Sequence, residues 1–331
     1  MVDKLIKDRG NRVKIDTEVE GKTGEVDFDT LKSGGLIKQR QKDLFTVRLR
    51  CPGGRVPLSK LEKILEVAKK YAGDYVHLSV RQSIELPYVN FHDFKKLNEE
   101  LLEADQKIAS CGRRIRVPTA CSGCEYNPNG IMDTQKMAEL VNGRFFAHPV
   151  PHKFKISFSG CPIDCARTSE NDLGFQGAVK PEWVDALCIG CRICATACKE
   201  GAIESSPENG KPIFHPQKCL YCGDCISSCP TDSWQEERKG WIIRVGGKHG
   251  RHPVLGHKIA EFVSDEDIPE FIETIIKWYE KAGKECGNMR IGDVLRMPEQ
   301  WADFISDLRI KFDGKLLPNP KPPYKNEIHF E

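Results

Sequence analysis

The chain lacks any apolar run that approaches the roughly 20 residues a membrane-spanning helix needs. Its first residues, MVDKLIKDRG, lack the apolar segment of a secretory signal. Charge of one sign is also missing, since 50 lysines and arginines face 48 aspartates and glutamates. A net charge of +2 argues against a nucleic-acid partner and against adhesion to an anionic membrane. We therefore expect a cytoplasmic protein with no membrane span and no nucleic-acid partner.

Cysteine, by contrast, is abundant, with 15 among the 331 residues. Because cytosolic thiols are kept reduced, so many cysteines indicate metal or redox chemistry more than structural disulfides. Twelve of the 15 fall in short-spaced groups, which favours metal binding. A chain of this length also has room for a large core, in two domains or in one domain that carries an insertion.

Periodicity predicts an α+β fold for the first part of the chain. FTVRLR at 45–50 alternates as a strand, and segment 58–72 has a helical repeat of apolar residues. The apolar face expected for that helix consists of Leu58, Leu61, Leu65 and Ala68. Strands at 75–80 and 83–89 and a helix at 91–104 complete a sheet with helices on one face. The polar residues 1–42 are expected to form an N-terminal arm.

A similar order restarts after a central loop, with a helix at 133–146 and a strand at 154–159. Both blocks run a basic strand into a cysteine-containing turn, RLRCPGG and SFSGCP, which we interpret as a weak internal duplication. Chance similarity of two α+β segments is the alternative. Two cysteine-dense runs interrupt the second block, a strand resumes at 240–247, and two helices and an extended proline-rich end follow.

Both cysteine-dense runs have the spacing CxxCxxCxxxC. The first is Cys188, Cys191, Cys194 and Cys198, and the second is Cys219, Cys222, Cys225 and Cys229. In bacterial ferredoxins with two clusters, the fourth cysteine of each run ligates the other cluster. The expected 4Fe–4S ligand sets are therefore Cys188, Cys191, Cys194 with Cys229, and Cys219, Cys222, Cys225 with Cys198. Zinc is the competing interpretation, but two complete runs in tandem favour iron–sulfur clusters.

The combination of HKFKISFS at 152–159, GCPIDC at 160–165, the two runs and GGKHGRHP at 246–253 resembles the sirohaem-dependent nitrite and sulfite reductases. It is most similar to the anaerobic sulfite reductase C-subunit type and to dissimilatory sulfite reductases with a ferredoxin insertion. The likeness implies a duplicated α+β fold of mixed sheets and helices. Its ferredoxin-like half is 43–110, its sirohaem and 4Fe–4S domain is 111–182 with 238–331, and its inserted two-cluster ferredoxin is 183–237.

The resemblance implies sirohaem coupled to a third 4Fe–4S cluster through a shared thiolate. The last cysteine of CxxxC is the bridge in that family, so Cys165 is expected on the sirohaem iron and Cys161 on the cluster. The implied reaction is the six-electron reduction of sulfite to sulfide. Electrons would enter at the ferredoxin insertion from a low-potential donor protein or subunit, in a homo- or hetero-oligomer.

The remaining cluster ligands depart from the family pattern. The family usually supplies CxxxxxC, whereas ACSGCEYNPNG at 120–130 has Cys121 and Cys124, with Asn127 where the second cysteine would fall. Cys121 and Cys124 are expected to complete the four ligands on a rearranged loop, with Cys111 in reserve. The alternative is that the cluster is lost and these cysteines are simply buried, because free cysteine packs as a small hydrophobe.

Sirohaem carries eight carboxylates and sulfite is a dianion, so a site for both needs concentrated positive charge. By resemblance, the residues that hold the anion and donate protons are Arg50, Arg81, Lys153 and Lys155. Lys153 and Lys155 alternate on one predicted strand, so both can point the same way. Contacts with sirohaem carboxylates, or closure of the pocket, are expected from Arg116, Lys248, His249, Arg251 and His252. The plain alternative for each is a solvated surface charge.

Two other functions stay open at this point. Nitrite reduction to ammonia is also a six-electron reaction on sirohaem, and only the two-lysine HKFK element leans toward sulfite. A non-catalytic sirohaem or iron–sulfur electron-transfer subunit is favoured by the altered loop at 120–130. The matching CxxxC element and basic positions argue against that second alternative.

Overall fold

The computed structural model describes residues 6–7, 12–15, 24–27, 31–32, 34–41 and 43–325. The chain forms two compact units. Unit 1 consists of Met1–Thr119 with Glu139–Lys155, and unit 2 consists of Ala120–Ala138 with Ile156–Glu331. Helix α4 (Thr134–Phe145) contributes residues to both. None of the helices among the described residues is long and apolar enough to cross a bilayer.

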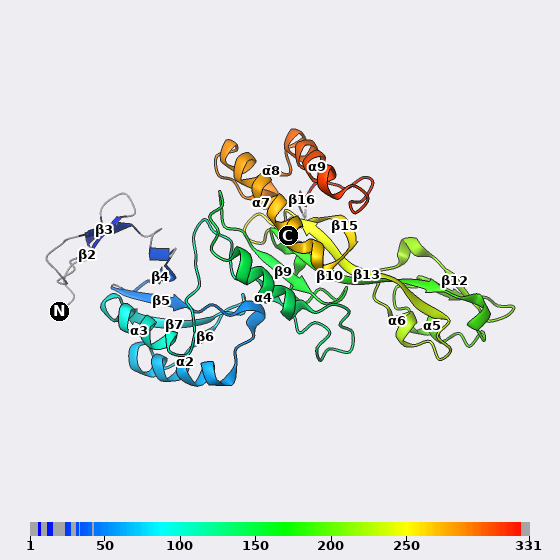
Figure 1. The fold of residues 1–331 in the computed structure, drawn as a ribbon, viewed down its shortest axis with the longest axis horizontal. Helices are drawn as coiled ribbons and strands as arrows, with labels where there is room; N and C mark the ends of the chain where they lie inside the picture. The colour runs from blue at the N-terminus through cyan, green and yellow to red at the C-terminus, as the bar shows by residue number, and fades with distance from the viewer. Residues whose placement is uncertain are drawn as a thin grey trace, which may run out of the picture. The chain divides into compact units, whose positions relative to one another are not determined.

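Unit 1 is built on a four-stranded antiparallel sheet in the order β4-β5-β7-β6. The strands are β4 (Leu36–Lys38), β5 (Leu44–Arg48), β6 (His77–Leu78) and β7 (Ile84–Asn90). Helices α2 (Leu58–Tyr71) and α3 (Phe94–Leu102) share one apolar core with β5 and β7 (Figure 1). The α+β arrangement predicted for this part of the chain is therefore confirmed.

The buried face of α2 differs from the predicted one. Ile64 and Ala68 are buried and Leu61 is partly buried, whereas Leu58 and Leu65 are 76% and 43% exposed. Positions 61, 64 and 68 follow the i, i+3, i+7 repeat of one helical stripe, and that stripe passes through Ile64. The helix is therefore predicted correctly, but its buried stripe passes through Ile64 and excludes Leu58 and Leu65.

Part of the predicted N-terminal arm is regular structure. Three short strands pair as an antiparallel sheet: β1 (Ile6–Lys7), β2 (Arg12–Ile15) and β3 (Gly24–Asp27). Leu31 and Leu36 are buried together with Phe45 of β5. This end of the arm therefore belongs to the core of unit 1.

Unit 2 is built on a five-stranded mixed sheet in the order β15-β13-β10-β9-β8. The strands are β8 (Thr119–Ala120), β9 (Ile156–Ser159), β10 (Leu173–Trp183), β13 (Trp234–Val245) and β15 (His257–Val263). β9 and β10 run parallel, and β10, β13 and β15 are antiparallel. Phe158 stacks on Phe175 with ring centroids 4.8 Å apart, and Trp241 meets Phe158 edge-on at 5.6 Å. These rings fix the centre of the sheet, where β9 ends in the GCPIDC turn.

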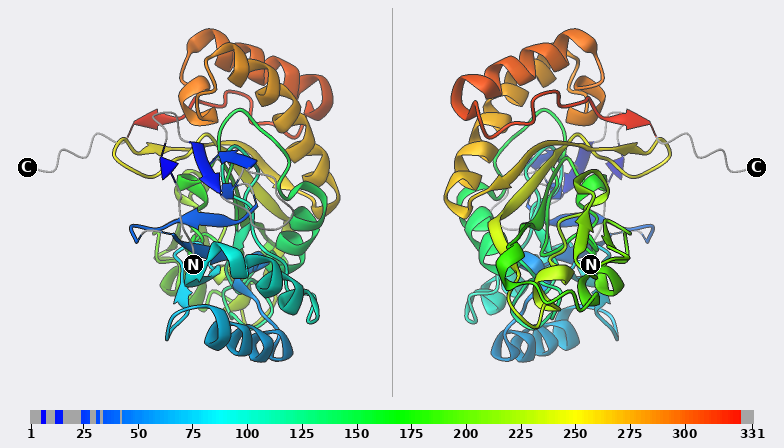
Figure 2. Two further views of the ribbon diagram at one scale, coloured as in Figure 1. Left: turned by 90° about the vertical axis from the view of Figure 1, so that its left-hand side faces the viewer. Right: turned by 90° about the vertical axis from the view of Figure 1, so that its right-hand side faces the viewer.

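Three helices complete unit 2 on one side of this sheet, as Figure 2 shows in orange and red. They are α7 (Ile268–Glu285), α8 (Ile291–Val294) and α9 (Pro298–Phe312). Phe271 of α7 stacks on Phe312 of α9 at 3.7 Å. The short strands β14 (Val254–Leu255) and β16 (Tyr324–Lys325) pair beside them.

The cysteine-dense segment leaves unit 2 through a pair of neighbouring strand ends. β10 and β13 are paired from Leu173 and Val245 to Trp183 and Trp234, so residues 184–233 begin and end at the same place (Figure 1). The segment contains α5 (Ile193–Ala197), α6 (Asp224–Ser227) and the hairpin of β11 (Ile203–Ser205) and β12 (Pro212–Phe214). It also has a small core of its own, which includes Ile203 and Trp234.

Candidate functional site

The eight cysteines of the two runs line two separate cavities. One small cavity is lined by Cys188, Cys191 and Cys194 of the first run and Cys229 of the second. The other is lined by Cys219, Cys222 and Cys225 of the second run and Cys198 of the first. The structure thus groups the cysteines in the two sets that the spacing predicts, with the fourth cysteine exchanged between runs.

The same backbone geometry shapes both runs. φ is positive at Gly190 and Arg192 in the first run and at the matching Tyr221 and Gly223 in the second. Arg192 and Gly223 directly precede α5 and α6, so the third cysteine of each run enters a short helix. At Gly190, a Cβ would lie 2.2 Å from a backbone oxygen of the β11–β12 hairpin, so a side chain is excluded there. The turns therefore aim three sulfurs of each run at one cavity.

Burial raises the pKa of four of these thiols, whereas at Cys229 burial is outweighed by hydrogen bonds from nearby backbone amides, which lower the pKa. Burial raises the pKa of Cys194, Cys219 and Cys222, and it raises the pKa of Cys225 to about 12. Buried thiols of this kind become thiolates when a metal displaces the proton, which couples ligation to proton release. Within the described ranges, no three His, Cys, Asp or Glu side chains converge as ligands of a single metal ion would.

A tight turn after β9 presents Cys165 at the surface of unit 2, where its side chain is exposed. Asp164 adopts a left-handed conformation with φ of 56°. Its carboxylate accepts hydrogen bonds from the Ser159 hydroxyl and the Thr168 amide, each at 2.8 Å. The Ser159 oxygen in turn accepts the Ala166 amide at 3.0 Å. The residues on both sides of Cys165 are therefore held in place.

Cys161 and Cys121 lie close to this turn. Cys161 is buried, and burial followed by the charges of nearby Cys121 and Cys165 raises its pKa. The Cys121 sulfur accepts the amide of Gly160, in the turn itself, at 3.1 Å. The fourth predicted ligand, Cys124, is exposed on the same loop as Cys121. The structure thus brings three of the four predicted cysteines together and places Cys124 at the surface.

Unit 1 contains an open, basic cavity of about 390 Å³. It is lined by Lys32, Ile37, Arg48, Cys111, Gly112, Arg113, Arg116, His152 and Lys153, so the described lining includes no acidic residue. Arg116 donates to the Gly112 carbonyl at 3.1 Å, but its buried Nε has no hydrogen-bond partner. An unpaired buried donor costs about 1–3 kcal/mol, which an anionic ligand in the cavity would offset. The cavity therefore fits a group that carries several carboxylates.

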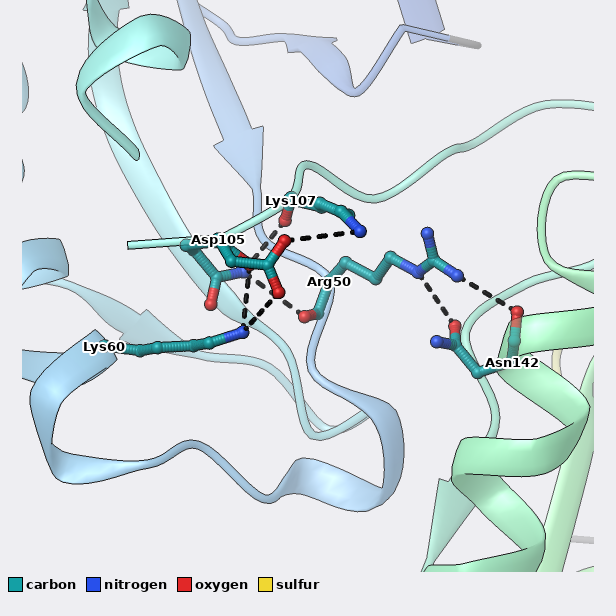
Figure 3. A network of polar contacts seen from close by, with 6 residues as sticks. Arg50, Lys60, Asp105, Lys107 and Asn142 are labelled. Carbon is teal, nitrogen blue, oxygen red and sulfur yellow. Dashed lines mark hydrogen bonds and ion pairs between the residues drawn. The ribbon is translucent and has the colours of Figure 1, made fainter. Parts of the chain in front are cut away.

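Of the four basic residues predicted to hold substrate, Lys153 lines this cavity, whereas Arg50, Arg81 and Lys155 do not. Arg50 donates from two nitrogens to the side-chain and backbone oxygens of Asn142, each at 3.0 Å (Figure 3). Its guanidinium lies 3.9 Å from the ring centroid of Phe146, and burial lowers its pKa. Arg81 donates to the Val117 carbonyl at 2.9 Å. Both arginines are thus anchored to the main chain of unit 1.

The lysine pair keeps the alternation expected from the sequence. Phe154 is fully buried, while Lys153 and Lys155 on either side of it are half-buried. Lys153 lines the basic cavity together with Arg116. Lys155 directly precedes β9, the strand that leads to the cysteine turn.

The four basic residues predicted near 250 belong to unit 2. Lys248 binds both carboxylate oxygens of Asp293, at 2.6 and 2.7 Å. The His249 ring lies 3.6 Å from Glu170, and its side chain is exposed. Arg251 and His252 are also exposed. The structure therefore gives Lys248 an internal carboxylate partner and leaves the other three at the surface.

Three arginines at these sites were absent from the sequence prediction, and one of them, Arg113, lines the basic cavity. Arg48 lines the basic cavity and is paired with Glu85 at 2.6 Å. The alternation of FTVRLR could have indicated it, because it lies on the same strand face as Arg50. Arg244 of β13 donates to Gln176 at 3.2 Å, Gln176 donates to the carbonyl of Pro162, and the buried Arg244 Nε has no partner. An arginine within an apolar strand was the only sequence signal for it.

Comparison with known proteins identifies the family. Residues 111–297 match the "Nitrite and sulphite reductase 4Fe-4S domain", and residues 37–104 match the "Nitrite/Sulfite reductase ferredoxin-like half domain". The chain is 30% identical over 329 residues to the coenzyme F420-dependent sulfite reductase of Methanocaldococcus jannaschii. That alignment covers 99% of this chain and 50% of the relative, so the chain spans half of the relative's length.

One further relative and one solved structure are similar to the chain. The C subunit of the anaerobic sulfite reductase of Salmonella typhimurium is 28% identical over 278 residues, which cover 76% of this chain and 80% of that protein. The fold resembles the crystal structure of dissimilatory sulfite reductase I, with a TM-score of 0.68 at 20% identity over 87% of this chain and 74% of that one. Since one family domain alone covers more than half of the residues, the chain belongs to the nitrite and sulfite reductase family of enzymes.

Proposed function

We propose that this chain is a sirohaem- and 4Fe–4S-dependent sulfite reductase that converts sulfite to sulfide with six electrons. The observation that carries the proposal is the turn in which Cys161 is buried, Cys165 is exposed and Cys121 lies nearby. A buried thiolate and an exposed one, four residues apart, suit a cluster on the inner side and a haem iron on the outer side. The names of the relatives favour sulfite as substrate.

In this proposal Cys165 would hold the sirohaem iron. The coupled cluster would be held by Cys121, Cys124, Cys161 and Cys165. When bound, sirohaem would supply a redox-active iron for the reduction of sulfite. Its carboxylates are assigned to Arg116, Lys248, His249, Arg251 and His252. The unpaired Nε of Arg116 supports the first of these assignments.

Sulfite itself is assigned to Arg50, Arg81, Lys153 and Lys155. Cations near the sulfite oxygens stabilise the charge that develops as S–O bonds break, and ammonium groups donate protons to the departing oxygens. Because Arg50 already gives two donors to Asn142, we assign it an electrostatic role. The lysines, each half-buried on one side of Phe154, are the proposed proton donors.

The electrons are proposed to pass through residues 184–233 as an inserted two-cluster ferredoxin. The two cysteine-lined cavities support this assignment. The donor is a low-potential protein or subunit, and the name of the Salmonella relative, a subunit, supports assembly with partners. In this proposal the fold is a duplicated one, in which the two α+β parts of the chain correspond to two copies of one reductase half.

The test is the cofactor content of the anaerobically purified full-length protein. We expect a sirohaem absorption band and about 12 cluster irons per chain, with a haem spectrum that changes on addition of sulfite. A protein with about eight cluster irons and no haem band would instead be an electron carrier. Turnover of sulfite against nitrite under one strong reductant distinguishes the two substrates, because the family includes reductases of both.

A further inference from the structure

We infer that the two cysteine sets of residues 184–233 act in a fixed order. The inner set, next to Cys161, is Cys198, Cys219, Cys222 and Cys225. The outer set, where electrons enter, is Cys188, Cys191, Cys194 and Cys229. This inference rests on the proposed function and specifies its electron route.

A third cavity in unit 2 joins the inner set to the CxxxC turn. It measures about 190 Å³ and is lined by Asn129, Cys161, Pro162, Ile163, Lys199, Glu200, Leu220, Cys222 and Asp224. Cys161 of the proposed haem-coupled centre and Cys222 of the inner set therefore open onto one space. Glu200, Leu220 and Asp224 line both this cavity and that of the inner set, so the two cavities adjoin.

The outer set is separate from this route. None of the described residues that line its cavity also lines the cavity at Cys161. Cys191 is exposed, whereas the other seven cysteines of the two runs are buried or half-buried. Neighbouring apolar side chains are open to solvent as well, with Ile189 69% and Ile193 42% exposed. Leu220 beside the inner set is 48% exposed as well, so it is the exposed Cys191 that favours the outer set as the one an external donor approaches.

The chemistry of the route is a series of one-electron transfers. A low-potential one-electron donor, such as a reduced iron–sulfur protein, is oxidised by one electron as the outer centre is reduced. The same electron then moves to the inner centre and from there to the centre at Cys161. Each transfer leaves one partner oxidised and the next reduced, with no bond made or broken. Because electron transfer weakens steeply with distance, the shared cavity decides which set is adjacent to Cys161.

Two charged residues allow the order to be tested without touching a ligand. Lys199 lines the cavity that joins the inner set to Cys161, and Arg192 lines the cavity of the outer set. A cation beside a cluster stabilises the reduced, more negative state. Removal of the cation therefore lowers the midpoint potential of that cluster. Lys199→Gln and Arg192→Gln are the matched pair of variants.

The experiment is a redox titration of the anaerobic full-length protein followed by electron paramagnetic resonance. The cluster adjacent to Cys161 is recognised by its magnetic interaction with the haem-coupled centre, which falls steeply with distance. We expect Lys199→Gln to lower the midpoint potential of the interacting cluster and Arg192→Gln to lower that of the other cluster. The order is overturned if Arg192→Gln shifts the interacting cluster and Lys199→Gln does not.

The same titration separates failure of the order from failure of the proposed function. A protein that holds three clusters and reduces sulfite, but whose interacting cluster responds to Arg192→Gln, has the proposed function with the reverse order. A wild-type protein without clusters in residues 184–233, or without haem, contradicts both. Both variants replace exposed side chains, so loss of folding is not expected to obscure the result.

Discussion

The two cysteine regions of unit 2 arrive at their geometry in different ways. In residues 184–233, each cavity takes three cysteines from a single run of seven residues, with one cysteine from the other run. Around Cys165, the site joins two segments that are distant in the chain, through hydrogen bonds such as that from Gly160 to Cys121. The cysteine sets of residues 184–233 follow from the spacing of the cysteines in the sequence. The site around Cys165 forms because the sheet brings β8 and β9 side by side.

The two cysteine regions therefore differ in how strongly they depend on the rest of the fold. The run cysteines depend on local turns with positive φ, such as those at Gly190 and Gly223. The Cys165 site depends on close packing between the loop after β8 and the turn after β9. Changes in that packing should therefore disturb the proposed haem-coupled centre and leave the two proposed run clusters intact.

The largest expected effect comes from Cys165→Ala. If Cys165 is the shared ligand, its removal uncouples or releases the haem and abolishes sulfite turnover. The signals of the two run clusters should remain, because their ligands are local. Absorption and electron paramagnetic resonance spectra of the anaerobic protein measure both. Cys286→Ala, a half-buried cysteine 4.0 Å from the Met297 sulfur, is the control and should change neither. A normal haem spectrum in Cys165→Ala would refute the assignment.

A smaller effect is expected from Lys155→Ala. Loss of a proton donor and a cation should lower sulfite turnover by about 10²–10⁴-fold. The haem absorption and the cluster signals should stay close to those of the wild type, since Lys155 is not a proposed metal ligand. Steady-state turnover together with the spectrum of the resting protein provides the check. Unchanged turnover would place the substrate site elsewhere.

Asp164 offers a sharper test of how the turn positions Cys165. Asp164→Ala removes the acceptor for Ser159 and Thr168 and puts alanine at a φ of 56°. Because such supporting contacts orient metal ligands, haem occupancy or turnover should fall by about 10–100-fold. Asp164→Asn keeps an acceptor oxygen and tolerates the left-handed conformation, so it should stay near the wild type. Equal behaviour of the two variants would mean that the hydrogen bonds do not position Cys165.

Sequence alone predicted what is local in this molecule. The spacing of the runs gave both cysteine sets, and periodicity gave α2, α3, α4, α7 and α9. It could not assign the stripe of α2, because Leu58, Leu61 and Leu65 form an equally regular pattern and only tertiary packing selects Ile64. It also missed Arg48 in the basic cavity and Arg244 beside the turn, since both depend on pairing across strands. The part of the site that escaped prediction is the part assembled from distant segments.

The smallest expected effect concerns the packing that supports the assembled site. At Gly160, an alanine Cβ would lie 2.8 Å from the Cα of Gly123, so the loop after β8 must shift. We expect Gly160→Ala to destabilise the protein by about 1–3 kcal/mol and to broaden the signals of the haem-coupled centre alone. Gly143→Ala in α4, where no atom lies within 4 Å of the new Cβ, should instead stabilise by about 0.5–1 kcal/mol. Thermal unfolding of both variants measures whether each substitution lowers or raises the stability. A Gly160→Ala protein with wild-type stability would show that the loop and the turn adjust independently, and the contrast between local and assembled cysteine sites would then fail.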